Sequence, residues 1–183
     1  MRDRLSFKEL RSAHGFEDAD YGHNITRLVD ASGNDLSHTI VDTMMRIDLP
    51  RPLAPGKKVV FELDWHYKIT DHGAVGGRSG YSTFEKGDAD IFFLAQWFPR
   101  MAAYTDYAGW QHKQFLRRGE FTLEFGDYDV TLTVPADHIV SSTGSLENGN
   151  EVLTKTQLKR LTSANDKAPV FIVTPEEALK KEK

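Results

Sequence analysis

Cysteine is absent from the 183 residues of this chain, which excludes disulfide bonds, thiolate metal ligands and a thiol nucleophile. No apolar run approaches the roughly 20 residues that a membrane helix needs, and the amino-terminal stretch lacks the apolar segment of a signal peptide. A basic excess is missing as well, because 23 Lys and Arg stand against 27 Asp and Glu. We therefore expect neither a membrane-spanning segment nor a nucleic-acid partner.

Two motifs that would carry site chemistry are incomplete. The glycine-rich stretch 71–80, DHGAVGGRSG, lacks the spacing of a phosphate-binding loop, and we expect a surface loop there. The histidines are dispersed, the closest pair being His66 and His72, and no His-Glu-x-x-His occurs. The residues alone therefore indicate no metal ligands and no catalytic residues in this chain.

Strand signals are abundant. Apolar residues make up 39% of the chain, which is enough for a folded core in one domain of this length. Apolar and polar side chains alternate over 59–69, which predicts a strand with one apolar face. The stretch 44–49 alternates in the same way. The proline-rich link 50–56 between the two predicts that they are antiparallel neighbours.

Turn signals separate further candidate strands. The stretch 31–35, ASGND, predicts a turn. Alternation resumes in 121–125 and 128–134, with a change of phase at Gly126 that predicts a bulge or a tight turn. The Asn-Gly pair that begins at Asn148 predicts a hairpin.

The end of the chain carries a helix signal. After the apolar run 171–173, Thr174-Pro-Glu-Glu has the capping threonine, the proline and the glutamate that begin many helices. No other convincing helix pattern precedes it. The sequence therefore predicts an all-β fold of packed or strongly bent antiparallel sheets, with a short helix at the C-terminal end.

The segment 92–110 has the strongest chemical character. It contains seven aromatic residues among polar ones, namely Phe92, Phe93, Trp97, Phe98, Tyr104, Tyr107 and Trp110. Aromatic rings with a few polar groups can form a ligand cleft or a sugar-stacking platform. A core strand that leads into a well-packed loop has the same composition, so both interpretations stay open.

Three segments, taken in order, carry a resemblance to a known family: MMRIDLPRPLAPGKKVVFELDWHYKI, AQWFPRMAAYTDYAGW and GEFTLEFGDYDVTLTVPADHIVSSTGSL. They strongly resemble the N-terminal region of bacterial aminopeptidase N-type (gluzincin) zinc metallopeptidases. The resemblance covers roughly Ile25 to Leu146, most of the chain. The QWFPR segment looks like the family's stretch that ends in Phe-Pro, and 127–142 looks like its paired sheet strands with the Val-Pro turn.

The resemblance implies a saddle-like β-domain that packs on a thermolysin-like catalytic domain. In this family His-Glu-x-x-His and a later Glu bind zinc, and a Gly-x-Met-Glu-Asn strand grips the amino end of the peptide. Neither motif is in this sequence. We therefore expect residues 1–183 to be one N-terminal β-domain with its core at 25–174. Residues 175–183 would begin a helix or linker toward a downstream catalytic domain that holds the zinc.

Under this interpretation the chain has no peptidase activity of its own, and its partners are the catalytic domain and the peptide substrate. Family β-domains also lend one Gln or Glu side chain to the pocket that holds the substrate's free amino group. Residue type favours Gln96 for this role, whereas counting back from Phe98-Pro99 without gaps favours Asp90. Both are candidates, and an acceptor or carboxylate suits an ammonium group.

A free-standing β-sandwich binding module is the alternative. It would hold a carbohydrate or a peptide with the aromatic residues of 92–110. This hypothesis predicts exposed, coplanar rings at four positions: Trp97, Tyr104, Tyr107 and Trp110.

Overall fold

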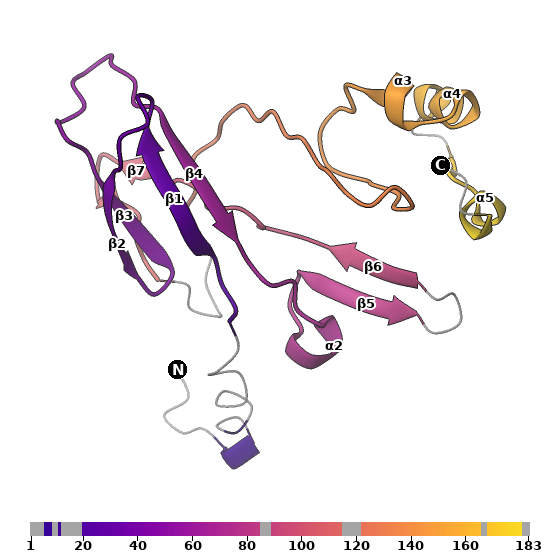
Figure 1. Ribbon diagram of the computed structural model, residues 1–183, viewed down its shortest axis with the longest axis horizontal. Coiled ribbons are helices and arrows are strands. Elements are labelled where there is room, and N and C mark those ends of the chain that lie inside the picture. The colour runs from indigo at the N-terminus through magenta and orange to yellow at the C-terminus, as the bar shows by residue number, and fades with distance from the viewer. Residues whose placement is uncertain are drawn as a thin grey trace. The chain divides into compact units, whose positions relative to one another are not determined.

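A computed structural model of the protein describes residues 6–8, 11, 20–84, 89–114, 122–165 and 168–180. The chain divides into two compact units, residues 1–126 and 127–183. In Figure 1 the first unit runs from indigo to salmon and the second is orange to yellow. The named strands of the described residues all belong to the first unit, whereas the second unit contains three short helices. The expectation of one domain with its core at 25–174 stays a prediction.

Strand β1 (Asn24–Asp30) pairs antiparallel with β4 (Phe61–His66). Along β4 half-buried Phe61, Leu63 and Trp65 alternate with exposed residues, so the predicted alternation is confirmed over a shorter range. The register slips at Thr26, whose hydroxyl donates to the carbonyl oxygen of Asp64 at 3.2 Å. This bulge lets the start of β1 follow the twist of β4.

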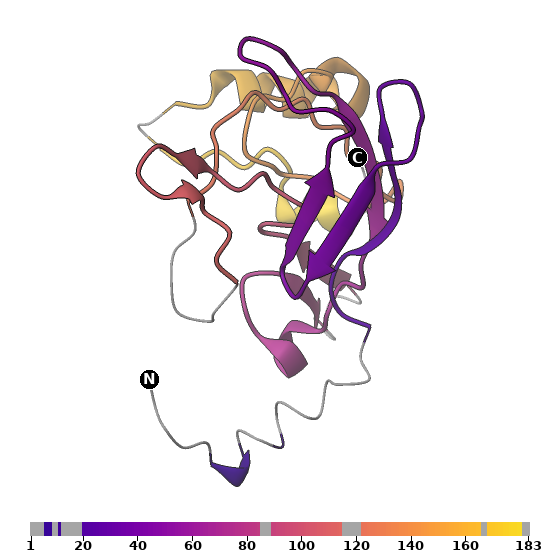
Figure 2. The same ribbon diagram turned by 90° about the vertical axis from the view of Figure 1, so that its left-hand side faces the viewer.

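The predicted pairing of 44–49 with 59–69 is wrong. Strand β3 (Met44–Asp48) pairs with β2 (Ser37–Val41), and the two form a hairpin that is also seen in Figure 2. Its two-residue turn contains Asp42 with a φ of 49°. Two-residue hairpin turns need positive φ, and Asp tolerates it better than most residues.

The predicted turn at 31–35 is confirmed. The carboxylate of Asp30 accepts hydrogen bonds from the backbone N–H of Ser32 at 2.8 Å and of Asn34 at 3.0 Å. Leu36 then returns to donate its N–H to the carbonyl oxygen of Leu28 at 3.1 Å. Leu28, Val29 and Leu36 are buried, and they form the apolar centre of this part of the first unit.

A second hairpin consists of β5 (Gly80–Phe84) and β6 (Ala89–Phe93). The one-turn helix α2 (His72–Val75) precedes it within the glycine-rich stretch, where the sequence predicted only a loop. The side chain of Asp71 caps this helix by accepting from the N–H of Gly73. Short strands β7 (Tyr104–Thr105) and β8 (Gly109–Trp110) form a third hairpin.

The second unit contains α3 (Gly149–Val152), α4 (Lys155–Ser163) and α5 (Pro175–Leu179). The helix predicted to begin after Thr174 is confirmed, with its capping box to Glu177. Helix α4 was not predicted from the sequence, although Thr154 and Gln157 form the same type of capping box. Arg160 links the two helices by donating to the carboxylate of Glu177 at 2.6 Å.

Two predictions for the second unit are wrong. Residues 128–134 form no strand, because no backbone ladder holds them within the described part of the chain, and their apolar side chains are exposed. Asn148 begins no hairpin turn but precedes α3. Gly149 serves close packing there, since a Cβ on it would lie 3.0 Å from the Leu158 side chain.

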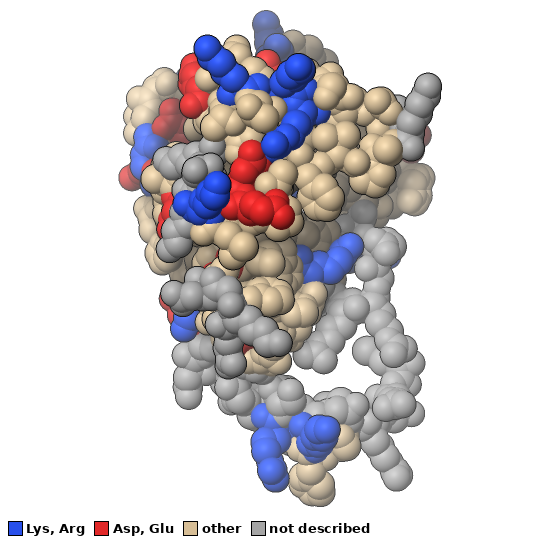
Figure 3. Space-filling view, turned by 90° about the vertical axis from the view of Figure 1, so that its right-hand side faces the viewer, with Lys and Arg blue, Asp and Glu red and all other residues tan. Residues whose placement is uncertain are grey.

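The regular secondary structure of the described residues consists mainly of strands in small antiparallel sheets, with few short helices, so the mainly-β class is confirmed. None of the described helices is both long enough and apolar enough to cross a membrane. On the face drawn in Figure 3, Lys and Arg lie beside Asp and Glu, and uncharged residues cover much of the surface.

Candidate functional site

One concave site of the described residues lies where the ends of the β1–β4 pair and of the β5–β6 hairpin meet. Because β1 starts where β4 ends, residues 21–23 and 67–70 are neighbours. Because β5 starts where β6 ends, residues 79–80 and 94–97 are neighbours too. The N–H of Tyr81 donates to the carbonyl oxygen of Thr70 at 2.9 Å and joins the two pairs of segments.

We call this site the aromatic cleft. It has a volume of about 220 Å³. Its lining residues are Tyr21, Gly22, His23, Tyr67, Lys68, Ile69, Thr70, Ser79, Gly80, Leu94, Ala95, Gln96 and Trp97. Ligand pockets for whole drug-sized molecules hold roughly 300–1,000 Å³, so the aromatic cleft suits a smaller group such as one amino-acid residue.

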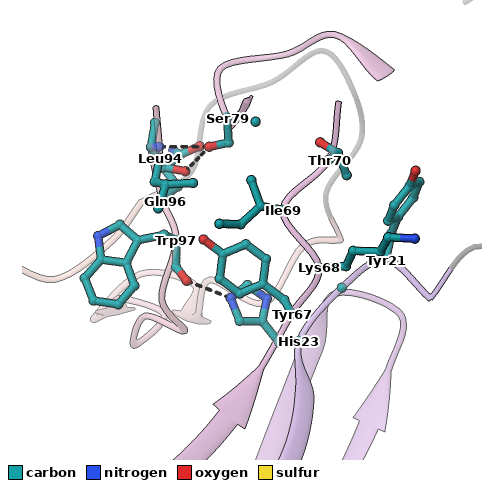
Figure 4. A pocket seen from close by; sticks show the side chains of 13 residues that line it. Tyr21, His23, Tyr67, Lys68, Ile69, Thr70, Ser79, Leu94, Gln96 and Trp97 are labelled. Atoms are coloured by element: carbon teal, nitrogen blue, oxygen red, sulfur yellow. Dashed lines mark hydrogen bonds between the residues drawn. The ribbon is translucent and has the colours of Figure 1, made fainter. Parts of the chain in front are cut away.

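Ring contacts build one wall of the aromatic cleft. The imidazole of His23 lies 5.2 Å from the ring centroid of Tyr67 and 6.3 Å from that of Trp65. The indoles of Trp65 and Trp97 stack at 6.4 Å with an angle of 30° between their planes. In addition, Nε2 of His23 lies 3.0 Å from the carbonyl oxygen of Trp97, as the dashed line in Figure 4 shows.

A tight turn at Gln96, directly before Trp97, also borders the aromatic cleft. Ser79 holds Ala95 twice, because its hydroxyl donates to the Ala95 carbonyl oxygen at 2.7 Å and accepts from the Ala95 N–H at 2.8 Å. Gln96 follows with a φ of 54°, a left-handed conformation that is uncommon for a residue other than glycine. Its side chain is exposed, and its amide makes no hydrogen bond with the described residues.

Polar groups of the aromatic cleft are few and mostly neutral. Partial burial raises the pKa of Tyr67, so its hydroxyl keeps its proton at neutral pH. The ammonium of Lys68 lies 6.0 Å from the ring centroid of Tyr21. Among the described residues, no carboxylate lines the aromatic cleft. Binding here would therefore rest on ring faces, on neutral acceptors such as Gln96 and on the single Lys.

The structure separates the two residues that the sequence proposed together. Gln96 lines the aromatic cleft, and Asp90 does not. Asp90 lies on β6 opposite Thr83, whose hydroxyl donates to its carboxylate at 2.6 Å. Phe93 is the end of β6 nearest the cleft, and the three residue steps from Asp90 to Phe93 span about 10 Å of strand.

The aromatic segment 92–110 also divides. Trp97 belongs to the aromatic cleft, whereas Tyr104 and Trp110 lie on the β7–β8 hairpin. These two rings meet edge to face, with an angle of 80° between their planes and 5.3 Å between centroids. They are not the coplanar pair that a flat sugar platform needs.

Sequence reasoning missed the contribution of His23, Tyr67 and Ser79. Tyr67 belongs to the alternating stretch 59–69 and was expected only on the apolar face of a strand. His23 has no local signal at all, since its partner Trp97 is 74 residues away. The pairing of β1 with β4 would have been the one clue, because it brings residue 23 beside residue 67.

Within the part of the chain that the structure describes, no three His, Asp or Glu side chains gather in a way that could hold a metal ion. Comparison with protein-family models, with curated proteins and with solved structures finds no match to this chain.

Proposed function

We propose that this chain is the non-catalytic N-terminal β-module of an aminopeptidase N-type zinc peptidase, and that Gln96 receives the free amino group of a peptide. In this proposal the small antiparallel sheets belong to a bent, saddle-like β-sandwich. The zinc and the residues that cleave the peptide would reside in a separate catalytic domain. The contribution of this chain is to bind and orient the amino end.

The position of Gln96 carries the proposal. The residue comes from one of the segments that together resemble the family, and it lines the aromatic cleft with its amide unpaired among the described residues. Figure 4 places Gln96 on the same side of the aromatic cleft as Trp97, with Tyr67 between them and Lys68. A side-chain carbonyl oxygen at this place can accept a hydrogen bond from an ammonium group.

The neutral character of the aromatic cleft sets the expected affinity. An ammonium would be held by the Gln96 oxygen and by the π faces of Tyr67 and Trp97 rather than by a carboxylate. Phenylalaninamide is a minimal probe because it combines a free amino group with one ring. At about −0.3 kcal/mol for each of its roughly 12 non-hydrogen atoms, its Kd would be on the order of 1 mM.

The test is a titration of the full chain with phenylalaninamide, followed by the NMR signal of the Trp97 indole N–H, which all the variants retain. We expect N-acetylphenylalaninamide not to bind, because its amino group is blocked and carries no charge. Gln96→Ala should weaken binding about tenfold or more, since a hydrogen bond to a charged group is lost. Gln96→Glu should tighten binding, because a carboxylate replaces a neutral acceptor.

Asp90→Asn is the matched control, since Asp90 is the other sequence candidate and lies outside the aromatic cleft. We expect it to change Kd by less than about twofold, within the scatter of surface substitutions. Equal binding of the acetylated probe, or a loss of affinity with Asp90→Asn but not with Gln96→Ala, would contradict the proposal.

The free-standing binding module remains the second candidate, and one observation favours it. Tyr104, Tyr107 and Trp110 are 62%, 84% and 53% exposed, so their rings are open to a ligand. The perpendicular arrangement of Tyr104 and Trp110 argues against a flat stacking surface. Titration with a neutral oligosaccharide decides between the candidates: shifts of the Tyr107 and Trp110 signals would favour the module, and we expect none.

A further inference from the structure

The turn at Gln96 needs to be held in place. A left-handed φ of 54° is unfavourable for a residue with a side chain, so the turn would relax unless its neighbours prevented it. On the N-terminal side the hydroxyl of Ser79 binds both backbone groups of Ala95. This contact fixes the backbone before Gln96, so a different group must fix the backbone after it.

His23 provides the contact after Gln96. Its Nε2 lies 3.0 Å from the carbonyl oxygen of Trp97, the residue directly after Gln96. A carbonyl oxygen can only accept, so Nε2 of His23 must carry the proton and donate it. The contact therefore selects the Nε2-protonated form of the imidazole or the imidazolium, and both forms can keep the bond.

The imidazole is itself fixed by rings from a second strand. It contacts the ring of Trp65, near the end of β4, and the ring of Tyr67, just beyond β4. Trp65 in turn stacks on the indole of Trp97. Backbone and side chain of Trp97 are thus both tied to the same group of residues. Figure 4 shows the His23 ring under the Tyr67 ring, with Nε2 directed at the Trp97 carbonyl.

We propose that His23 is a positioning residue that holds Gln96 in its left-handed conformation and directs its amide into the aromatic cleft. The ligand is the free amino group of a peptide, as in the proposed function. The inference rests on the proposed function for this ligand, whereas the contacts of His23 do not depend on it. Ser79 and His23 together fix the two sides of a single strained residue. Removing the His23 donor should free the side on which Gln96 joins Trp97.

Two substitutions separate the ring of His23 from its donor. His23→Phe keeps an aromatic ring against Tyr67 but removes the N–H, whereas His23→Gln supplies an amide N–H at about the same reach. His38→Phe is the matched control, because His38 lies on β2 outside the aromatic cleft. We expect His23→Phe to weaken phenylalaninamide binding about three- to tenfold, as the competent turn becomes a minor population.

His23→Gln should restore Kd to within about twofold of the parent chain, and His38→Phe should leave it unchanged. The sign of φ at Gln96, read from NMR backbone couplings, is the ligand-independent measurement. It should be positive in the parent chain and in His23→Gln, and it should become negative in a large fraction of His23→Phe molecules.

Each outcome decides the proposal. An unchanged Kd and a positive φ in His23→Phe would overturn it. So would equal losses of affinity and of melting temperature in His23→Phe and His23→Gln, because they would show a general structural role. If the parent chain does not bind phenylalaninamide, the proposed function fails, and the φ of Gln96 in the two variants alone confirms or refutes the positioning role.

Discussion

Among the described glycines, Gly80 is the one whose replacement should cost this protein most stability. It begins β5, it is buried, and its φ is +145°, a conformation that residues with a side chain rarely adopt. A Cβ built there would lie 2.7 Å from the carbonyl oxygen of Thr70 and 3.3 Å from both the N and the Cβ of His72. The nearest atom is backbone, and the N–H of Tyr81 is bonded to it, so it cannot move aside without breaking that bond.

The cost of Gly80→Ala has two parts. Forcing alanine into this region of φ costs about 1–3 kcal/mol, and overlap with a well-fixed neighbour adds about 1–3 kcal/mol. The restriction of the unfolded chain by alanine returns about 0.4–1 kcal/mol. We therefore expect Gly80→Ala to destabilise the first unit by about 1–5 kcal/mol.

Gly77→Ala separates the two parts. Gly77 lies in the same glycine-rich stretch with a φ of +99°, but no atom lies within 4 Å of its would-be Cβ, so this variant carries only the conformational cost. Urea unfolding followed by tryptophan fluorescence is the assay, because all 3 Trp belong to the first unit. At an m-value of about 2 kcal/mol/M, the extra overlap in Gly80→Ala lowers the midpoint by about 0.5–1.5 M relative to Gly77→Ala. Equal midpoints for the two variants would refute the close approach of β5 to Thr70.

Two further predictions concern side chains that join distant segments. The amide of Gln114 accepts from the N–H of Thr43 at 2.9 Å and from its hydroxyl at 2.7 Å, and it donates to the carbonyl oxygen of Val41 at 2.9 Å. Gln114→Ala should therefore weaken the β2–β3 hairpin by about 1 kcal/mol, seen as faster amide hydrogen exchange in that hairpin than in β1 and β4. In the second unit, hydrogen bonds from Arg160 and from the N–H at position 174 lower the pKa of Glu177. Stability from this ionised group is complete above the ordinary Glu pKa of about 4.3 and is lost as the pH falls below it. Circular dichroism should show helix loss on acidification in the parent chain, with a weaker pH dependence in Glu177→Gln; identical acid transitions in the two proteins would contradict the role of this ion pair.

The candidate site could be predicted only in part. Gln96 was found from its residue type and from the resemblance of its segment, and it lines the aromatic cleft. Asp90 was an equal candidate in the sequence, because counting back from Phe98-Pro99 without gaps pointed to it, whereas residue type pointed to Gln96. The fold separates the two by placing Asp90 opposite Thr83, away from the end of β6 that borders the aromatic cleft.

Features that depend on neighbouring residues were determined by the sequence itself. The turn after Asp30, the alternation along β4 and the capping box at Thr174 all involve groups at most four residues apart, so their energetics are contained in a short window. The capping box at Thr154 belongs to the same class, and its signal was present although it was not used.

Pairings between distant segments were decided only by the tertiary structure. Alternation makes a strand possible but does not choose its partner: β3 pairs with β2 through a turn that Gln114 holds, and β4 pairs with β1, while 128–134 alternates without becoming a strand. Each long-range pair must repay the entropy of closing a loop, and whether it does so depends on burial and hydrogen bonds that no local window contains. The contact of His23 with Trp97 exists for that reason, because only the joining of the β1–β4 pair to the β5–β6 hairpin brings residues 74 positions apart within hydrogen-bond distance.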